Sequence, residues 1–229
     1  MGLLADLVSP VRCAACGTIC DADLCAPCAV LLEPVTDPMC RRCGAPGGDG
    51  RAASCRQCRG LSGFRRARSL LSYSGPATRL TLALKHHGRG DLASVAGELL
   101  GDLAVRHGMG AGTTIAWVPA GSSAAVRGFD HAELLARAVA RRLGVPCRHV
   151  LVRAAQGRRQ AEVAMSARRD NVRGRFRAKP VSGEVLVVDD VFTTGATAEA
   201  CAQALTAAGA TAVDVLTFAR TLRRLPARA

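Results

Sequence analysis

The sequence predicts an α/β fold, in which a parallel sheet is flanked by helices and preceded by a small cysteine-rich module. Three observations support this prediction. Short apolar segments alternate with segments of helical periodicity, one continuous apolar run ends in two acids, and four Cys-x-x-Cys pairs lie before residue 59. Such alternation is typical of parallel sheets with right-handed crossovers. We expect residues 1–62 to form the module and residues 63–229 to form the α/β domain.

The elements of the α/β domain follow one another along the chain. Pro76 suits the first turn of a helix, and Gly144 suits the position just after a helix end. Residues 153–179 carry nine basic and two acidic side chains and are expected to be irregular. We expect strands at residues 64–73, 114–118, 147–152, 185–189 and 213–219, and helices at 76–86, 91–106, 131–143 and 197–208.

Composition narrows the class of protein. No stretch of 18 uninterrupted apolar residues occurs, so no membrane span is expected. The first ten residues lack the basic start of a signal peptide and are predicted to form a short amphipathic helix. We therefore expect a cytoplasmic protein, in which cysteines stay reduced and bind metal rather than form disulfides.

The net charge of +13 is unevenly distributed. Residues 1–62 carry six basic and six acidic side chains, whereas residues 63–229 carry 25 basic and 12 acidic ones. A positive field favours phosphate-rich partners such as single-stranded DNA. Only Lys85 and Lys179 are lysines in a chain rich in arginine, alanine and glycine, so a GC-rich coding sequence explains the basic excess equally well.

Eight cysteines form four pairs with a two-residue gap between the members. Eight thiolates can make two tetrahedral four-cysteine zinc sites. Gly17 and Gly44 follow the first and third pairs, where a positive φ aims backbone N–H groups at sulfur. The two halves repeat, so we expect one zinc ion in each half; interleaved pairing and an iron–sulfur cluster are the alternatives. The pairs are Cys13/Cys16, Cys25/Cys28, Cys40/Cys43 and Cys55/Cys58.

A zinc ion held by four thiolates has no open coordination position, so both ions are expected to be structural. The cysteine-rich segment has little core of its own, and the metals would supply its folding free energy. Its role would be to bind nucleic acid, a protein or the neighbouring domain. No aromatic residue lies between Cys13 and Cys58, which argues against stacking on bases.

Residues 185–197 carry the clearest chemical signal in the chain. The apolar run at residues 185–188 suits a strand buried on both faces, and Asp189 and Asp190 follow it. Open α/β sheets bind ligands at the carboxyl ends of their strands. The turn Thr193-Thr194-Gly195-Ala196-Thr197 opens a helix, whose free backbone N–H groups suit a phosphate. Carboxylates for sugar hydroxyls beside N–H groups for a phosphate predict a ribose 5-phosphate site; a plain strand–turn–helix is the alternative.

This segment resembles the phosphoribosyl-diphosphate signature of type I phosphoribosyltransferases at all thirteen positions. The resemblance implies a phosphoribosyltransferase-like sheet, in which Asp189 and Asp190 hold the ribose 2′- and 3′-hydroxyls and are central to any catalysis. It implies that residues 193–197 wrap the 5′-phosphate and that Mg²⁺ accompanies the diphosphate. Catalysis would then depend on positioning and charge stabilisation rather than on a protein nucleophile.

Further motifs resemble the ComF family over essentially the whole chain. They are the paired cysteine motifs, Tyr73-Ser74-Gly75-Pro76 with Lys85, the run Arg127-Gly128-Phe129-Asp130-His131, and a downstream pattern that includes Gln160, Ser166 and Arg168. By this resemblance Arg127 and Lys85 join the phosphoribosyl-diphosphate site. The family usually has several basic residues where this chain has residues 120–126, and Asn-Gln where it has Asp130-His131, which weakens the case for pyrophosphate binding and turnover.

Two functional hypotheses follow. The ComF resemblance implies a protein that binds phosphoribosyl diphosphate or a nucleotide and handles single-stranded DNA during natural transformation. The alternative is an active phosphoribosyltransferase of nucleotide metabolism or salvage, whose acceptor base the sequence does not specify. A further hypothesis gives the cysteine-rich module a protein partner, such as a DNA-uptake helicase.

Overall fold

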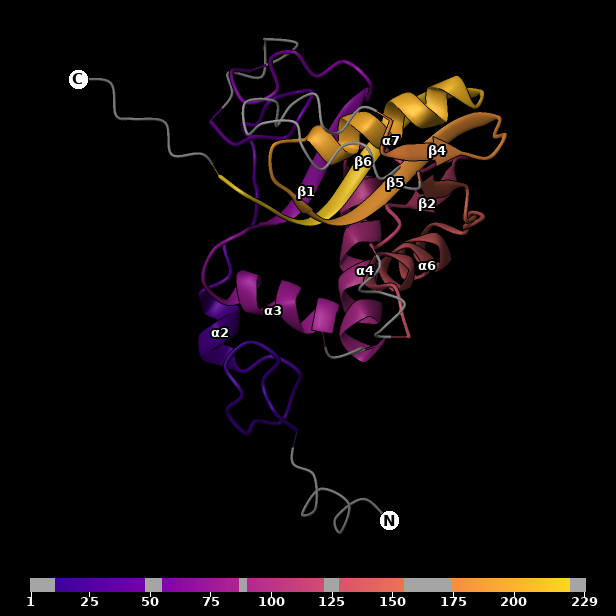
Figure 1. Ribbon diagram of the computed structural model, residues 1–229. Coiled ribbons are helices and arrows are strands. Elements are labelled where there is room, and N and C mark those ends of the chain that lie inside the picture. The colour runs from indigo at the N-terminus through magenta and orange to yellow at the C-terminus, as the bar shows by residue number, and fades with distance from the viewer. Residues whose placement is uncertain (1–10, 48–54, 87–89, 122–127, 155–173, 223–229) are drawn as a thin grey trace, which may run out of the picture.

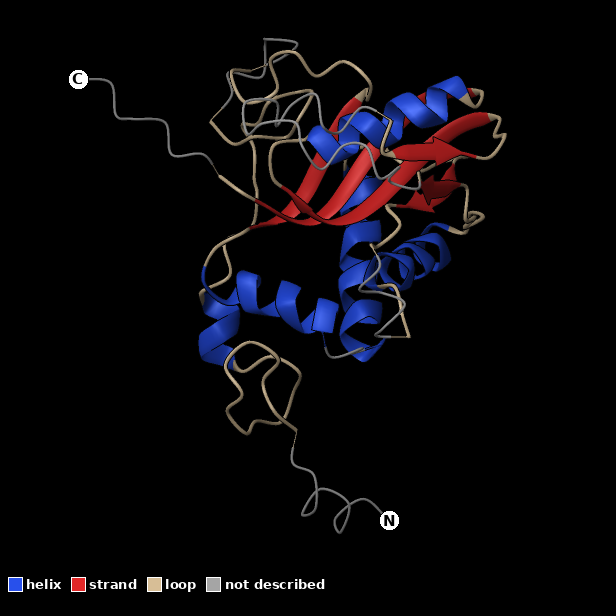
Figure 2. Ribbon diagram, in the orientation of Figure 1, coloured by secondary structure: helices blue, strands red, loops and turns tan. Residues whose placement is uncertain are grey.

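Four parallel strands form the centre of the protein (Figures 1 and 2). The computed structural model describes residues 11–47, 55–86, 90–121, 128–154 and 174–222. The spatial order of the strands is β1-β6-β5-β2, and every neighbouring pair is parallel. The strands are β1 (Arg66–Ser72), β2 (Thr114–Trp117), β5 (Gly183–Phe192) and β6 (Ala210–Arg220).

Helices cover both faces of this sheet. α3 (Gly75–His86), α4 (Gly90–Arg106) and α6 (His131–Leu143) lie on one face, and α7 (Ala196–Ala207) lies on the other (Figure 1). Side chains along β5 alternate between the two faces of the sheet, because successive residues of a strand point in opposite directions. Leu186 and Val188 pack in the core that contains α3, α4 and α6, whereas Val185 and Val187 pack in the core that contains α7. The predicted parallel sheet flanked by helices is therefore confirmed.

The ends of α6 agree with the local sequence. Asp130 caps the helix by accepting a hydrogen bond from the backbone N–H of Ala132 at 3.0 Å, and its second oxygen accepts one from the N–H of Ala120 at 2.9 Å. Gly144 follows the last turn in the left-handed conformation, with φ of 67°. Asp130 thus connects the start of α6 to Ala120, in the segment that follows β2.

Two predictions for the residues that follow α6 are wrong. Residues 147–152 are not one strand: Cys147 forms a single parallel bridge with Ile115, and only β3 (Leu151–Arg153) continues. The supposedly irregular segment 153–179 contains β4 (Phe176–Ala178), which pairs with β3 in a separate antiparallel sheet. A three-residue strand is too short to leave a period-2 pattern in the sequence.

The two cysteine groups do not form one body beside the sheet. The first group, near α2 (Ala26–Val30), packs in the core with α3 and α4, and the second packs in the core with α7 (Figure 1). Between them the chain runs along the edge strand: the N–H of Val35 donates to the carbonyl of Leu70, and the N–H of Ser72 donates to the carbonyl of Glu33. The division of the chain at residue 62 stays a prediction about folding units, since both groups share the cores of the α/β part.

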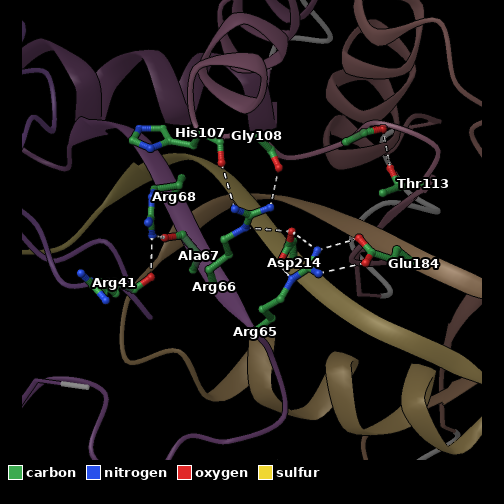
Figure 3. Close-up of polar contacts among 11 residues, drawn as sticks. Arg41, Arg65, Arg66, Ala67, Arg68, His107, Gly108, Thr113, Glu184 and Asp214 are labelled. Carbon is green, nitrogen blue, oxygen red and sulfur yellow. Dashed lines mark hydrogen bonds and ion pairs between the residues drawn. The ribbon is translucent and has the colours of Figure 1, made fainter. Parts of the chain in front are cut away.

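Buried charge at the amino-terminal ends of the strands is internally paired (Figure 3). Asp214, which is 2% exposed, accepts hydrogen bonds from the guanidinium groups of Arg65 and Arg66. Arg65 also holds Glu184, and Arg66 donates to the carbonyl of His107. Each charge has an opposite charge or a carbonyl beside it, so this cluster stabilises the sheet end opposite to the one where ligands are expected. No described helix combines the length and apolar character that crossing a membrane requires.

Candidate functional site

The eight paired cysteines gather into two groups of four. Cys13, Cys16, Cys25 and Cys28 form the first group, and Cys40, Cys43, Cys55 and Cys58 form the second. Within each group all Sγ atoms lie within 4.8 Å of one another. The sequential grouping expected from the repeat is confirmed, and the interleaved alternative is wrong.

Both groups have the dimensions of a tetrahedral zinc site. Four Zn–S bonds of about 2.3 Å place the sulfur atoms about 3.8 Å apart. The Sγ atoms of Cys16 and Cys25 are 3.7 Å apart in the first group. In the second group, Cys40 and Cys58 are 3.8 Å apart, and Cys43 and Cys55 are 3.6 Å apart. Two four-cysteine zinc sites therefore fit the chain, and Cys20 lies outside them, with its thiol donating to the carbonyl of Ala22.

The backbone around each group favours a thiolate at one position. Burial would raise the pKa of Cys13, but N–H groups of Cys25, Cys16 and Ala15 outweigh it and lower that pKa to about 6. Burial likewise opposes ionisation of Cys40, and N–H groups of Cys43 and Arg42 lower its pKa to about 7. Burial raises the pKa of Cys28 to about 12 and also raises that of Cys43. A bound cation is what would allow all four sulfurs of a group to ionise together.

A cavity of about 290 Å³, including its open mouth, lies at the carboxyl ends of β5 and β6. This is the edge where parallel sheets bind ligands. A carboxylate and several hydroxyl groups supply its polar lining, and an aromatic ring supplies part of its apolar wall. The residues that matter for the chemistry are Asp189, Phe192, Thr193, Gly195, Thr197 and Thr217.

The predicted threonine turn forms one side of this cavity. Gly195 occupies the N-cap of α7 with φ of 81° and offers no side-chain cap to the first helical turn. The hydroxyl of Thr194 accepts from the N–H of Ala196 at 3.3 Å, which shapes the turn. A Cβ on Gly195 would lie 2.6 Å from Leu61 Cδ1 and 2.7 Å from Phe192 Cζ, so only glycine fits here. The first turn of α7 is thereby held open toward the cavity, where its N–H groups suit an anion.

The two adjacent acids point to opposite faces of the sheet. Asp189 lines the cavity, and burial together with the negative charge of Asp190 raises its pKa well above the usual value. Asp190 is 5% exposed on the other face. Its Oδ2 lies 2.5 Å from Lys85 Nζ and 3.4 Å from His131 Nε2, and these two groups outweigh burial and lower its pKa. Asp189 is therefore the acid that a ligand in the cavity would contact. Asp190 is already paired with Lys85 and His131 of the protein itself.

The predicted site residues thus fall into three sets. Asp189, Thr193, Gly195 and Thr197 line the cavity, and Thr194 and Ala196 complete the turn beside it. Lys85, at the end of α3, reaches Asp190 rather than the cavity lining. Arg127 and the segment with Gln160, Ser166 and Arg168 lie outside the described residues.

Sequence reasoning missed several residues around the cavity. The hydroxyl of Thr217, on β6, lies 2.7 Å from that of Ser69 on β1, although only their registers on neighbouring strands bring them together. Phe192 packs its ring against the edge of Phe64, with centroids 6.0 Å apart. Arg153 donates to the carbonyl of Pro119 at 2.9 Å and so anchors the segment that follows β2. The one available signal was the hydroxyl residues at positions 69 and 217, which lie within predicted strands.

Comparison with known proteins finds a family that matches the cysteine-rich segment and relatives that match most of the chain. The family described as the double zinc ribbon domain matches residues 4–59. The DNA utilization protein YhgH of Salmonella typhi is 30% identical over 207 residues, which cover 87% of this chain and 91% of that protein. YhgH of Escherichia coli strain K12 is 30% identical over 195 residues, covering 80% and 85%.

Two solved structures are similar over part of the chain. One is described as the allosteric regulatory enzyme of purine biosynthesis, with 24% identity and a TM-score of 0.42. The other is glutamine phosphoribosylpyrophosphate amidotransferase from B. subtilis complexed with ADP and GMP, with 25% identity and a TM-score of 0.41. The similarity covers 60% and 59% of this chain, which spans about 30% of the length of each of those chains.

Proposed function

The chain belongs to the ComF-like family, which includes the DNA utilization proteins YhgH, and from that premise we propose that it binds phosphoribosyl diphosphate or a nucleotide in the cavity beside α7. One observation carries the proposal: Asp189 and the open first turn of α7 border the same cavity. A carboxylate accepts hydrogen bonds from ribose hydroxyls, and helix N–H groups bind a phosphate. Mg²⁺ would arrive with the diphosphate, whose negative charge it offsets.

Calorimetry with phosphoribosyl diphosphate and Mg²⁺ tests this proposal. We expect binding by the zinc-loaded protein and at least a tenfold loss of affinity for Asp189→Asn, because the ribose then loses a charged acceptor. Asp102→Asn is the matched control, since Asp102 is a surface carboxylate that pairs with Arg142 away from the cavity. Equal affinities for the protein and Asp189→Asn would rule the cavity out as the ribose site.

We further propose that the protein handles single-stranded DNA in the cytoplasm, as the competence role implied by the ComF resemblance requires. The charge distribution supports this role, because 25 basic and 12 acidic side chains lie after residue 62. Neutralising phosphates releases counterions, so affinity for a single strand should fall steeply with salt. Fluorescence anisotropy with a labelled oligonucleotide between 50 and 200 mM salt measures this dependence, and salt-independent or absent binding would count against the role.

An active transferase, the alternative function, differs from a binding protein because it releases pyrophosphate as a product. Transfer of the ribosyl group breaks the bond to pyrophosphate, which is released as an attacking nitrogen forms the new bond. Pyrophosphate release in the presence of a panel of nucleobases would indicate transfer. Binding of phosphoribosyl diphosphate without such release would leave the binding function as the better description.

A further inference from the structure

A fully buried arginine connects the second cysteine group to the cavity. Arg220, at the end of β6, has an exposed fraction of 0%. Its guanidinium donates to the carbonyl of Cys43 and, at 3.1 Å, to Oε1 of Gln57. The same group lies over the ring of Phe192, 5.3 Å from its centroid. One side chain therefore contacts both the metal-binding loops and the wall of the cavity.

The charge of Arg220 needs an explanation, since burying a guanidinium is costly unless an opposite charge compensates it. Within the described part of the chain, the side chain has no carboxylate partner, and its hydrogen bonds go to a carbonyl and an amide oxygen. A zinc ion with four thiolates carries two net negative charges. The second cysteine group is thus the nearby source of compensating charge, and its metal and Arg220 stabilise each other.

A second connection runs through the segment that leaves this group. The N–H of Leu61 donates to the carbonyl of Cys58 at 3.0 Å, and Leu61 then covers Gly195. The N–H groups of Ser62 and Gly63 donate to the carboxylate of Glu199 on α7, at 3.0 and 2.8 Å. Residues 61–63, which the second metal would hold in place, therefore pack against the turn at residues 193–195 and against α7.

The first cysteine group has no comparable connection. It packs with α3 and α4 on the opposite face of the sheet. Cys16 is exposed, and the neighbouring Arg12 donates an exposed hydrogen bond to the carbonyl of Gly17. Within the described residues, no hydrogen bond of the first cysteine group reaches the cavity lining.

We propose that Arg220 is a positioning residue, through which zinc in the second cysteine group keeps the turn at residues 192–195 in its ligand-binding conformation. Zinc in the first group does not have this effect. The meaning of the turn as a ligand site rests on the proposed function, but the connection itself does not. Because coupling between the binding free energies of two sites is reciprocal, a ligand in the cavity would also raise the zinc affinity of the second group.

Hydrogen exchange of the zinc-loaded, full-length protein tests the connection without any ligand. We expect peptides covering residues 192–201 to exchange at least tenfold faster in Arg220→Met, while strand β1 and residues 183–191 of β5 keep their protection. Arg68→Met is the matched control. Arg68 is also buried and donates to the carbonyls of Arg41 and Ala67 beside the second group (Figure 3). The cation–π contact to the ring of Phe192 is made by Arg220.

The outcomes separate the proposal from its rivals. Faster exchange in Arg220→Met but not in Arg68→Met supports it, and unchanged or equally accelerated exchange overturns it. If Arg220→Met does not fold, Arg220→Lys takes its place, because an ammonium cannot bond two acceptors and cover the ring in the geometry of a guanidinium. Loss of one ligand from each group gives the second comparison: Cys58→Ser should accelerate exchange of residues 192–201, and Cys16→Ser should not.

Calorimetry with ribose 5-phosphate on the unmodified protein judges the proposed function separately. No binding would contradict the assignment of the cavity as a ribose-phosphate site. The exchange comparison would still decide whether Arg220 connects the second metal to the turn.

Discussion

The two faces of the parallel sheet are built from the same kinds of parts but use them differently. Each face has a four-cysteine group at its edge and one acid from the end of β5. On the face with α3, α4 and α6, Asp190 is bound by Lys85 and His131 and the cysteine group is partly exposed. On the face with α7, Asp189 borders an open cavity and the cysteine group encloses buried arginine charge. On the first face the acid is already paired with basic side chains of the protein. The second face leaves an acid and the start of α7 available to a ligand.

The largest expected difference between the faces is the effect of losing a metal. Cys43→Ser should lower the free energy of unfolding by about 3–5 kcal/mol, because it removes the charge that compensates buried Arg220. Cys16→Ser should lower it by less than half as much, since Cys16 is exposed to solvent and its hydrogen bond to Thr18 is exposed as well. Urea unfolding of both variants, with zinc content measured in parallel, checks this. Equal losses would mean that the two groups contribute alike.

A glycine in each group allows a sharper comparison. Gly17 and Gly44 both have positive φ, at 79° and 68°. A side chain in this conformation costs about 1–2 kcal/mol by itself. A Cβ on Gly17 would meet nothing within 4 Å, whereas on Gly44 it would lie 2.7 Å from the carbonyl oxygen of Ala67. Gly44→Ala should therefore destabilise the protein by a further amount of about 1–3 kcal/mol, and thermal unfolding of the two variants measures the difference.

The two acids should respond to pH in opposite directions. The lowered pKa of Asp190 means that its contribution is present above its unfolded value of about 3.9 and is lost as pH falls through the folded value. The raised pKa of Asp189 means that its contribution is present below about 3.9 and is lost as pH rises through the folded value. At neutral pH, Asp189→Asn should therefore stabilise the protein, and Asp190→Asn should destabilise it.

Urea unfolding of both asparagine variants between pH 4 and pH 8 measures the sign of each effect and the pH dependence of the Asp189 contribution, whereas the Asp190 contribution changes only below this range. Comparing each variant with the unmodified protein at the same pH cancels the pH dependence of zinc binding, which all three share. The stability difference between Asp189→Asn and the unmodified protein should grow as pH rises. A difference that stays constant over this range would contradict the assignment of Asp189 as a carboxyl group whose charged form is disfavoured by burial and by Asp190.

The sequence predicted the pattern that repeats and missed the contacts that folding creates. The four Cys-x-x-Cys pairs and the run ending in Asp189 and Asp190 depend on local spacing, so the cysteine grouping, the parallel sheet and the turn before α7 could be expected. That the two acids serve different faces follows from the alternation of a strand that continues to Phe192, beyond the predicted end at residue 189.

Arg220 shows why the remainder could not be predicted. Its partners Cys43 and Gln57 are 177 and 163 residues away in sequence, and its third partner, Phe192, meets it only through the register of β5 and β6. Nothing in the residues around position 220 marks it as buried. The same holds for the placement of the two cysteine groups on opposite faces of the sheet. A continuous cysteine-rich segment gives no sign that the chain between the groups runs along edge strand β1.

The smallest expected difference concerns two glutamates that fasten the cysteine-rich chain to each face. Glu199 accepts hydrogen bonds from the backbone N–H groups of Ser62 and Gly63, whereas Glu33 accepts one from the exposed hydroxyl of Ser74. Glu199→Ala leaves two N–H groups to find water beneath the second group and should cost about 1–2 kcal/mol. Glu33→Ala should leave the unfolding midpoint unchanged within error, because water replaces an exposed hydrogen bond readily. Chemical unfolding of the zinc-loaded variants decides this, and a larger loss for Glu33→Ala would reverse the ranking of the two faces, placing the tighter attachment at the first cysteine group.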